Sequence, residues 1–425
     1  MKTKHTVAEI SKFLSLTLLV SVASASAFAE GTIVEVGGIN ELKKHAVESD
    51  GTLTFSSDTP KTIRQKTYGW VFEGEYERDA DEPSPITVTV GKNVDLQLTN
   101  SSGLKVWDGA NLVVEGKISY DGMGTITLVD GEHTVSSTGT IVTEAMTLFS
   151  GAKLTVNGVV NLSQELAIGE YFDDGACFIA ENAKIDIGFA GIVNYATMQI
   201  TGTTLATGNI YNAGTINISG DSTLNVSSIN GEGKIIVDNG ARLTISSNAL
   251  LKHLTVEEGA TVNFGRVVEG SSVALESNKE QTVIVAETGT VELSTSASGV
   301  VINKAEALNV ADVAGISENL VAAWDFEITN DNSEEITVSA TIEAGLDVNT
   351  IKIWHGLEGG SWELLNENEG FEFDYNAESG KLTFSTNTFS PIVVSGSAAA
   401  PEPSAFGLLA GLGALALVAS RRRRK

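Results

Sequence analysis

The sequence predicts an all-β protein in which a parallel β-helix (solenoid) is followed by a small antiparallel β-sandwich. Three observations lead to this fold class. A short motif that begins with glycine recurs along residues 30–300, aromatic-rich strand patterns fill residues 323–397, and the chain has 43 glycines, 6 prolines and one cysteine. Glycine supplies turns, and the single Cys177 excludes an intramolecular disulfide. Stability must therefore come from packing and from hydrogen bonds between strands.

The recurring motif is a glycine followed by a strand whose apolar residues lie two positions apart. Such residues point to one face of a strand, and strands this short bury that face only by stacking coil on coil. The spacing of the copies is irregular, at about 15 to 25 residues. This favours a right-handed parallel β-helix with variable turns over the alternative, a series of antiparallel sandwiches. Copies begin at Gly109, Gly151, Gly240 and Gly259, and a sister pattern begins at Gly124, Gly214 and Gly289.

Two segments near the start of the solenoid differ from the repeats. Ile39, Leu42 and Ala46 have helical spacing, which predicts a short amphipathic helix that covers the first open coil. Residues 73–85 hold six acidic residues and two prolines, which predicts an exposed acidic loop. A Ca²⁺ site is the alternative for this loop, but neither EF-hand spacing nor a glycine-rich nonapeptide repeat is present.

The pattern changes after Ser296, where residues 301–322 are predicted to form a linker with a short helix. Residues 323–397 then carry strand patterns about 8 to 12 residues apart, typical of a small antiparallel sandwich. The predicted strands are Glu335–Ile342, Thr350–His355, Ser361–Leu365, Phe371–Tyr375, Lys381–Ser385 and Ser390–Val394.

The stretches Ile351–His355, Trp362–Leu365, Leu382–Ser385 and Phe389–Pro391 resemble a small Ig-like module found near the C-terminus of many bacterial surface proteins. The resemblance implies a spacer placed before an anchor. Trp354 and Trp362 are candidates for stacking on a sugar ring, and core packing is the alternative for each. Runs of Asn, Gly, Ser and Thr make the solenoid region similar in composition to the passenger regions of autotransporter-type adhesins, which commonly present a surface rather than catalyse.

Residues 1–29 have the composition of a secretory signal peptide. Three lysines precede an apolar run from Phe13 to Val22, and Ala27-Phe28-Ala29 supplies the small residues at the cleavage position. Cleavage by signal peptidase is expected after Ala29, and export follows from it.

The last 25 residues predict a second segment that interacts with a membrane. Residues 405–420 are uncharged, and as a helix they would span about 24 Å, close to the ~30 Å of a hydrocarbon core. Five cations follow at once, and such residues stay on the cytoplasmic side. A transmembrane helix with the body outside is therefore predicted, and a core helix with a basic tail is the alternative. The cations are Arg421, Arg422, Arg423, Arg424 and Lys425.

The order Pro401-Glu402-Pro403, short apolar helix and arginine-rich end resembles the PEP-CTERM sorting signal of Gram-negative bacteria. The resemblance covers residues 401–425. It implies that an exosortase-type membrane transpeptidase cuts near Pro401, Glu402 and Pro403, which are its substrate, and releases the body to the cell surface or to extracellular polysaccharide.

The charge of the body restricts its partners. Residues outside the two terminal segments include 19 basic against 52 acidic residues, a net charge near −33. Such a charge repels phosphates and carboxylates, so nucleic acid and anionic polymers are disfavoured as partners. Neutral glycans, cations and basic proteins remain, and extracellular polysaccharide is a candidate partner.

Catalytic and cofactor motifs are absent from the sequence. His45, His133, His253 and His355 are isolated, and neither a nucleophile elbow nor a phosphate loop is present. Asp173-Asp174 is the best carboxylate pair, and solvent-facing turn residues are its alternative. We therefore expect a non-enzymatic surface protein with a structural or adhesive role, without cofactor or metal. A polysaccharide-degrading enzyme on the same β-helix and a carbohydrate-binding protein are the alternatives.

Overall fold

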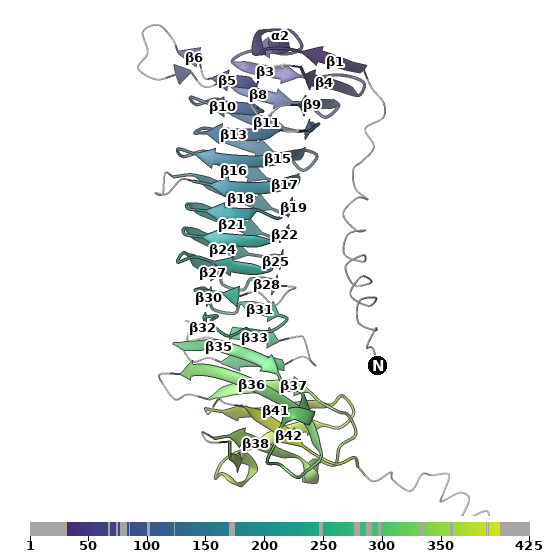
Figure 1. Ribbon diagram of the computed structural model, residues 1–425, viewed down its shortest axis with the longest axis vertical. Helices are drawn as coiled ribbons and strands as arrows, with labels where there is room; N and C mark the ends of the chain where they lie inside the picture. The colour runs from purple at the N-terminus through teal and green to yellow at the C-terminus, as the bar shows by residue number, and fades with distance from the viewer. Residues whose placement is uncertain are drawn as a thin grey trace, which may run out of the picture.

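The computed structural model is an elongated all-β molecule (Figure 1). About 60% of it is strand and 4% helix, and its main part is a β-solenoid of about nine turns. The predicted fold class is confirmed. The structure describes residues 32–399 apart from 67–68, 74, 77–82, 85, 100–102, 123, 170–174, 246–249, 276–280, 286–290, 296–298, 331–334, 358–359, 388 and 390. The predicted signal peptide and C-terminal helix lie outside the described residues.

Most coils of the solenoid consist of three short strands, and equivalent strands of successive coils pair in parallel. The strands form three faces, which the chain visits in the order I, II, III. Parallel pairing between successive coils excludes the alternative of tandem antiparallel sandwiches.

Face I contains β3 (Thr52–Phe55), β8 (Thr87–Val90), β11 (Asn111–Val114), β14 (Glu132–Val135), β16 (Lys153–Val156), β18 (Cys177–Glu181), β21 (Thr197–Thr201), β24 (Thr215–Ser219), β27 (Lys234–Val237), β30 (Leu254–Val256) and β32 (Val273–Leu275). Face II contains β1 (Thr32–Val36), β4 (Lys61–Gln65), β9 (Val94–Leu98), β12 (Lys117–Tyr120), β19 (Lys184–Ile187), β22 (Thr204–Thr207), β25 (Asp221–Asn225), β28 (Arg242–Ile245), β31 (Thr261–Phe264) and β33 (Gln281–Val285). Face III contains β5 (Trp70–Glu73), β10 (Leu104–Trp107), β13 (Thr125–Val129), β20 (Gly191–Asn194), β23 (Asn209–Asn212), β26 (Ser228–Asn230) and β29 (Leu250–Leu251).

Two longer strands, β15 (Thr140–Phe149) and β17 (Val159–Ile168), pass through the corner between faces II and III. Their first halves pair on face II and their second halves on face III, with an irregularity between Thr143 and Ala145. The length of a coil varies: Thr197 pairs with Thr215, 18 residues on, whereas Lys153 pairs with Cys177, 24 residues on. This variation explains the irregular spacing of the motif in the sequence.

Alternation of side chains along each strand builds the interior. In β16 the inward Leu154 and Val156 are at most 1% exposed, and in β18 the inward Phe178 is fully buried. Because β-branched and aromatic residues suit a pleated surface, and because equivalent positions of successive coils stack, the buried residues form one continuous apolar column.

The glycines of the two sequence patterns serve different purposes. Gly151, which begins a copy of the main motif, has φ +82° and occupies a left-handed turn position that favours glycine. Gly214, from the sister pattern, has ordinary backbone angles, but a Cβ there would lie 2.0 Å from the carbonyl oxygen of Ala196 in the coil before. The main motif thus needs glycine for its turn, whereas Gly214 is needed because the backbones of successive coils meet there.

The N-terminal end of the solenoid is capped as the sequence predicts. Helix α2 (Ile39–Lys43) places Leu42 in full burial and packs on β5, while β2 (Val47–Ser49) pairs antiparallel with β3. Within the segment predicted as an acidic loop, β6 (Glu75–Tyr76) and β7 (Pro83–Ser84) form a two-stranded antiparallel sheet beside this end (Figure 1).

The C-terminal sandwich continues two of the three solenoid faces. Face I extends through β35 (Val300–Ala307), β36 (Leu320–Asn330), β42 (Ile392–Ser395), β38 (Lys352–Gly356) and β39 (Trp362–Leu364), and face II through β34 (Val291–Thr295), β37 (Ile336–Thr341), β41 (Lys381–Thr386) and β40 (Phe373–Asn376). All these added pairings are antiparallel. Phe326 from one sheet and Val338 and Phe384 from the other belong to one apolar cluster.

The stretch 301–322, predicted as a linker, belongs largely to this sheet. It contains most of β35, the 3-10 helix η1 (Val310–Asp312) and the first residues of β36. In place of a linker, therefore, the structure has a strand whose Ile302 and Ala305 are buried. The remaining short helices of the sandwich are η2 (Val348–Thr350) and η3 (Leu365–Glu367).

Polar side chains occupy a few positions in the interior, and each described below is hydrogen-bonded. Asn194 and Asn212 stack in neighbouring coils, where Asn194 Nδ2 donates to Asn212 Oδ1 at 2.7 Å and Asn212 Nδ2 donates to the Lys234 carbonyl at 3.0 Å. Both residues are at most 1% exposed. Because a buried amide without partners is destabilising, these contacts are needed to keep the corner between faces III and I stable.

His133 takes an inward position of β14 between leucines of the neighbouring coils. Its Nδ1 accepts a hydrogen bond from the Leu112 N–H at 3.2 Å, and its Nε2 lies 2.7 Å from the Asp130 carbonyl, to which it donates. Burial lowers the pKa of His133 below its ordinary value, and the contact with Asp130 opposes this only in part. The folded protein therefore holds a neutral imidazole.

Stability is expected to fall as the pH drops below about 6.5, the ordinary pKa of histidine. In that range the unfolded chain binds a proton that folded His133 does not, and the loss continues until the pH reaches the lowered folded pKa. Urea denaturation midpoints between pH 7.5 and 5 measure this. The variant His133→Gln should have a weaker pH dependence. Since burial also lowers the pKa of His355, a smaller dependence of the same sign should persist. An equal dependence in both proteins would contradict this role of His133.

Candidate functional site

The folded body ends directly before the predicted sorting segment. After β42 the chain still makes a bridge between Ala398 and Leu346, and the Ala399 N–H donates to the Gly345 carbonyl at 2.8 Å. Only one residue separates Ala399 from Pro401. The predicted sorting residues therefore follow the fold without an intervening linker.

The residues predicted to direct export and sorting lie outside the described residues. This holds for Ala27 and Ala29, for Pro401, Glu402 and Pro403, and for the cations from Arg421 to Lys425. Between residues 32 and 399, the described helices are all too short or too polar to cross a membrane.

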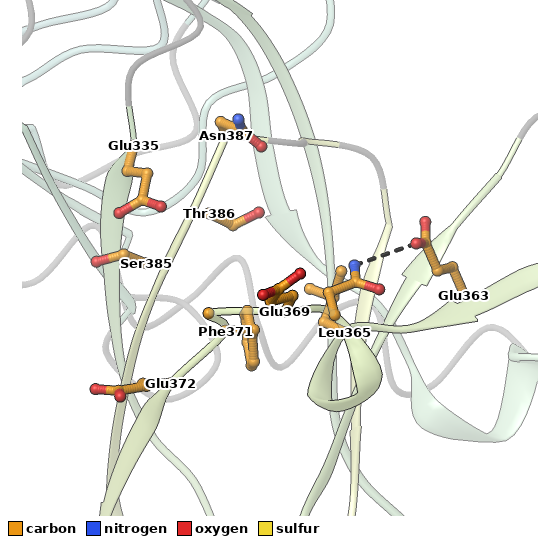
Figure 2. A pocket seen from close by; sticks show the side chains of 11 residues that line it. Glu335, Glu363, Leu365, Glu369, Phe371, Glu372, Ser385, Thr386 and Asn387 are labelled. Carbon is orange, nitrogen blue, oxygen red and sulfur yellow. Dashed lines mark hydrogen bonds between the residues drawn. The ribbon is translucent and has the colours of Figure 1, made fainter.

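A pocket of about 580 Å³ lies in the sandwich (Figure 2). Its wall comes from the start of β37, from β39 and η3, from the loop before β40 and from the end of β41. Leu365 is buried beneath it, and Phe371 packs against Phe384 with ring centroids 6.0 Å apart. The pocket is lined by Glu335, Glu363, Leu365, Asn368, Glu369, Gly370, Phe371, Glu372, Ser385, Thr386 and Asn387.

Four glutamates and no lysine or arginine line this pocket. Glu363 accepts a hydrogen bond from Asn368 at 3.1 Å, as Figure 2 shows, and lies 3.9 Å from His355. An anionic ligand would meet uncompensated negative charge here, so the pocket suits only neutral or cationic groups. The sequence did not indicate this site, because only the sandwich fold brings Glu335 and the end of β41 beside the glutamates of residues 363–372.

Trp354 and Trp362 both lie on the outer surface of the sheet, and each is half-buried. The indole N–H of Trp354 donates to Ser395 at 3.1 Å, and that of Trp362 donates to the Ala314 carbonyl at 2.8 Å. The segment between η1 and β36 thus packs on this surface through Ala314. Glu318 of the same segment forms an ion pair with Lys352. That ion pair lowers the pKa of Glu318. Both indoles are therefore held in part by contacts within the protein.

The other candidate groups of the sequence do not converge. Asp173-Asp174 lies outside the described residues, and Cys177 is half-buried on face I, where burial raises the pKa of its thiol. Among the residues that the structure describes, no three histidine, cysteine, aspartate or glutamate side chains are grouped to hold a metal ion.

Comparison with known proteins gives one finding. Residues 399–424 match the PEP-CTERM protein-sorting motif. No curated protein and no solved structure matches the chain.

The molecule is therefore a β-solenoid protein that carries a PEP-CTERM sorting motif. This motif implies processing by an exosortase, membrane association and export to the cell surface.

Proposed function

We propose that this protein has a structural or adhesive role at the cell surface or in the extracellular matrix, and that it acts by display and not by catalysis. The observation that supports the proposal is the direct succession of an elongated solenoid, a sandwich continuous with it and the sorting motif. Because two sheets run from the solenoid into the sandwich without a break, a bound partner would be held by a stiff body. Signal peptidase, the exosortase and extracellular polysaccharide are the partners of this proposal, in a Gram-negative cell.

The C-terminus of the mature protein tests the proposal. We expect mass spectrometry of the surface and culture fractions to find a terminus near Pro401, without Arg421–Lys425. Replacing Pro401, Glu402 and Pro403 together by alanine should leave the tail attached and keep the protein in the membrane fraction. Ser404→Ala, the residue after the Pro-Glu-Pro triplet, serves as the control and should be processed normally. A wild-type protein found only in the membrane fraction with Lys425 intact would overturn the proposal.

A further inference from the structure

A groove of about 280 Å³ lies at the corner between faces II and III of the solenoid, apart from the pocket in the sandwich. It is formed where β12 and β19 end and where β15 and β17 pass through the corner, so its wall comes from four coils that follow one another. Tyr120, Asn161, Ser163 and Asp186 are the side chains of this wall that can interact with a ligand through a ring or a polar group and are not fully buried.

The polar groups of the groove are available to a ligand. Ser163 is exposed and Asn161 and Asp186 are partly exposed, and none of their side chains makes a hydrogen bond or ion pair with another described residue. Asn161 and Asp186 are register partners on β17 and β19, so the amide and the carboxylate lie side by side on adjacent coils. Together they offer donors and acceptors along the axis of the solenoid.

An exposed aromatic residue directly follows the groove wall in the chain. Phe189 follows Gly188 of the groove wall and is 79% exposed, more than any other large apolar side chain in the described ranges. Gly188 is required at this corner, because a Cβ there would lie 1.9 Å from the Ser163 carbonyl oxygen. The sequence thus keeps the coils closely stacked at the groove while the next residue presents a ring to solvent.

From this arrangement we infer that the groove binds a neutral glycan. The apolar face of a sugar ring packs on an aromatic ring, and its hydroxyls bind amide, hydroxyl and carboxylate groups. No lysine or arginine lines the groove and the body carries a large negative charge, so anionic glycans are disfavoured. Four coils stacked about 4.8 Å apart cover about 14 Å, the length of roughly three linked sugars. This inference rests on the proposed surface role, since that role brings the groove to extracellular polysaccharide.

Affinity electrophoresis of the protein recovered from the surface fraction tests the site. Native gels would contain hydroxyethylcellulose, galactomannan or dextran as neutral probes and polygalacturonate as the anionic one. We expect retardation by at least one neutral polymer and none by polygalacturonate. Phe189→Ala and Asn161→Ala should each weaken binding about three- to tenfold.

Two variants control for general effects of substitution. Val348→Ala removes another exposed apolar side chain, in the sandwich, and Asn217→Ala removes an outward asparagine of face I; both should bind like the wild type. Absence of retardation in all three neutral gels, or equal binding by the groove variants, would overturn the glycan site. If the same surface fraction carries the terminus near Pro401, the surface role stands even then, so the two failures are distinguishable.

Discussion

Replacing Phe178 by alanine is expected to lower the free energy of unfolding by about 3–5 kcal/mol. Phe178 is fully buried on the inner side of β18, and its register partners are Leu154 and Met198 in the coils on either side. Alanine would leave a cavity in the middle of the apolar column, and a chain held in stacked coils can close it only in part.

A neighbouring phenylalanine provides the matched control. Phe189→Ala removes a side chain of the same kind from a solvent-exposed position after β19. It should change the free energy of unfolding by less than about 0.5 kcal/mol. Urea denaturation followed by circular dichroism measures both. Equal midpoints for Phe178→Ala and the wild type would show that the coil does not pack as described.

Asn212→Ala is expected to destabilise the protein by about 2–4 kcal/mol, the second largest effect. The substitution removes the nearer acceptor of Asn194 Nδ2, which leaves the Thr215 carbonyl at 3.4 Å, and it removes the donor to the Lys234 carbonyl. Asn194 is fully buried, so a hydrogen bond to water cannot replace the one that its amide loses. The damage should therefore extend over three coils.

Asn225→Ala is the control, because Asn225 is exposed at the end of β25. Its denaturation midpoint should match that of the wild type. The double variant Asn194→Ala/Asn212→Ala should lose less stability than the sum of the two single variants, since the hydrogen bond between them can be removed only once. If the losses of stability of the two single variants add up in full in the double variant, the hydrogen bond between Asn194 and Asn212 does not contribute as described.

Much of the fold could be predicted from the sequence, because alternation of apolar residues and turn glycines are local properties. Leu154 and Val156 after Gly151 predicted an inward strand, and Ile39, Leu42 and Ala46 predicted the cap. The six predicted sandwich strands agree with observed strands to within about two residues, as for Lys381–Ser385 against the observed Lys381–Thr386, whereas β36 was not predicted. These elements needed no knowledge of distant contacts.

The features that could not be predicted depend on which residues of neighbouring coils and strands lie side by side. Asn194 and Asn212 look like ordinary surface asparagines in the sequence, and only the register places one beneath the other. The groove combines Tyr120, Asn161 and Asp186 from three coils. Their alignment is hidden in the sequence, because register partners of successive coils there lie 23, 19 and 25 residues apart. The linker prediction failed to detect β35 because its pairing partner, β36, begins more than ten residues further on.

The direction of the hydrogen bonds between coils determines how the molecule would respond to mechanical load. Strands lie across the long axis in Figure 1, so the ladder bonds run along it, and a pull between the two ends would separate coils in sequence instead of shearing all bonds of a strand at once. A glycan held at β12–β19 of a protein anchored at its C-terminal end would strain only the coils from there to the sandwich. The cap of α2 and β1–β5 would carry no force, and the N-terminal coils would stay folded while those nearer the anchor yield.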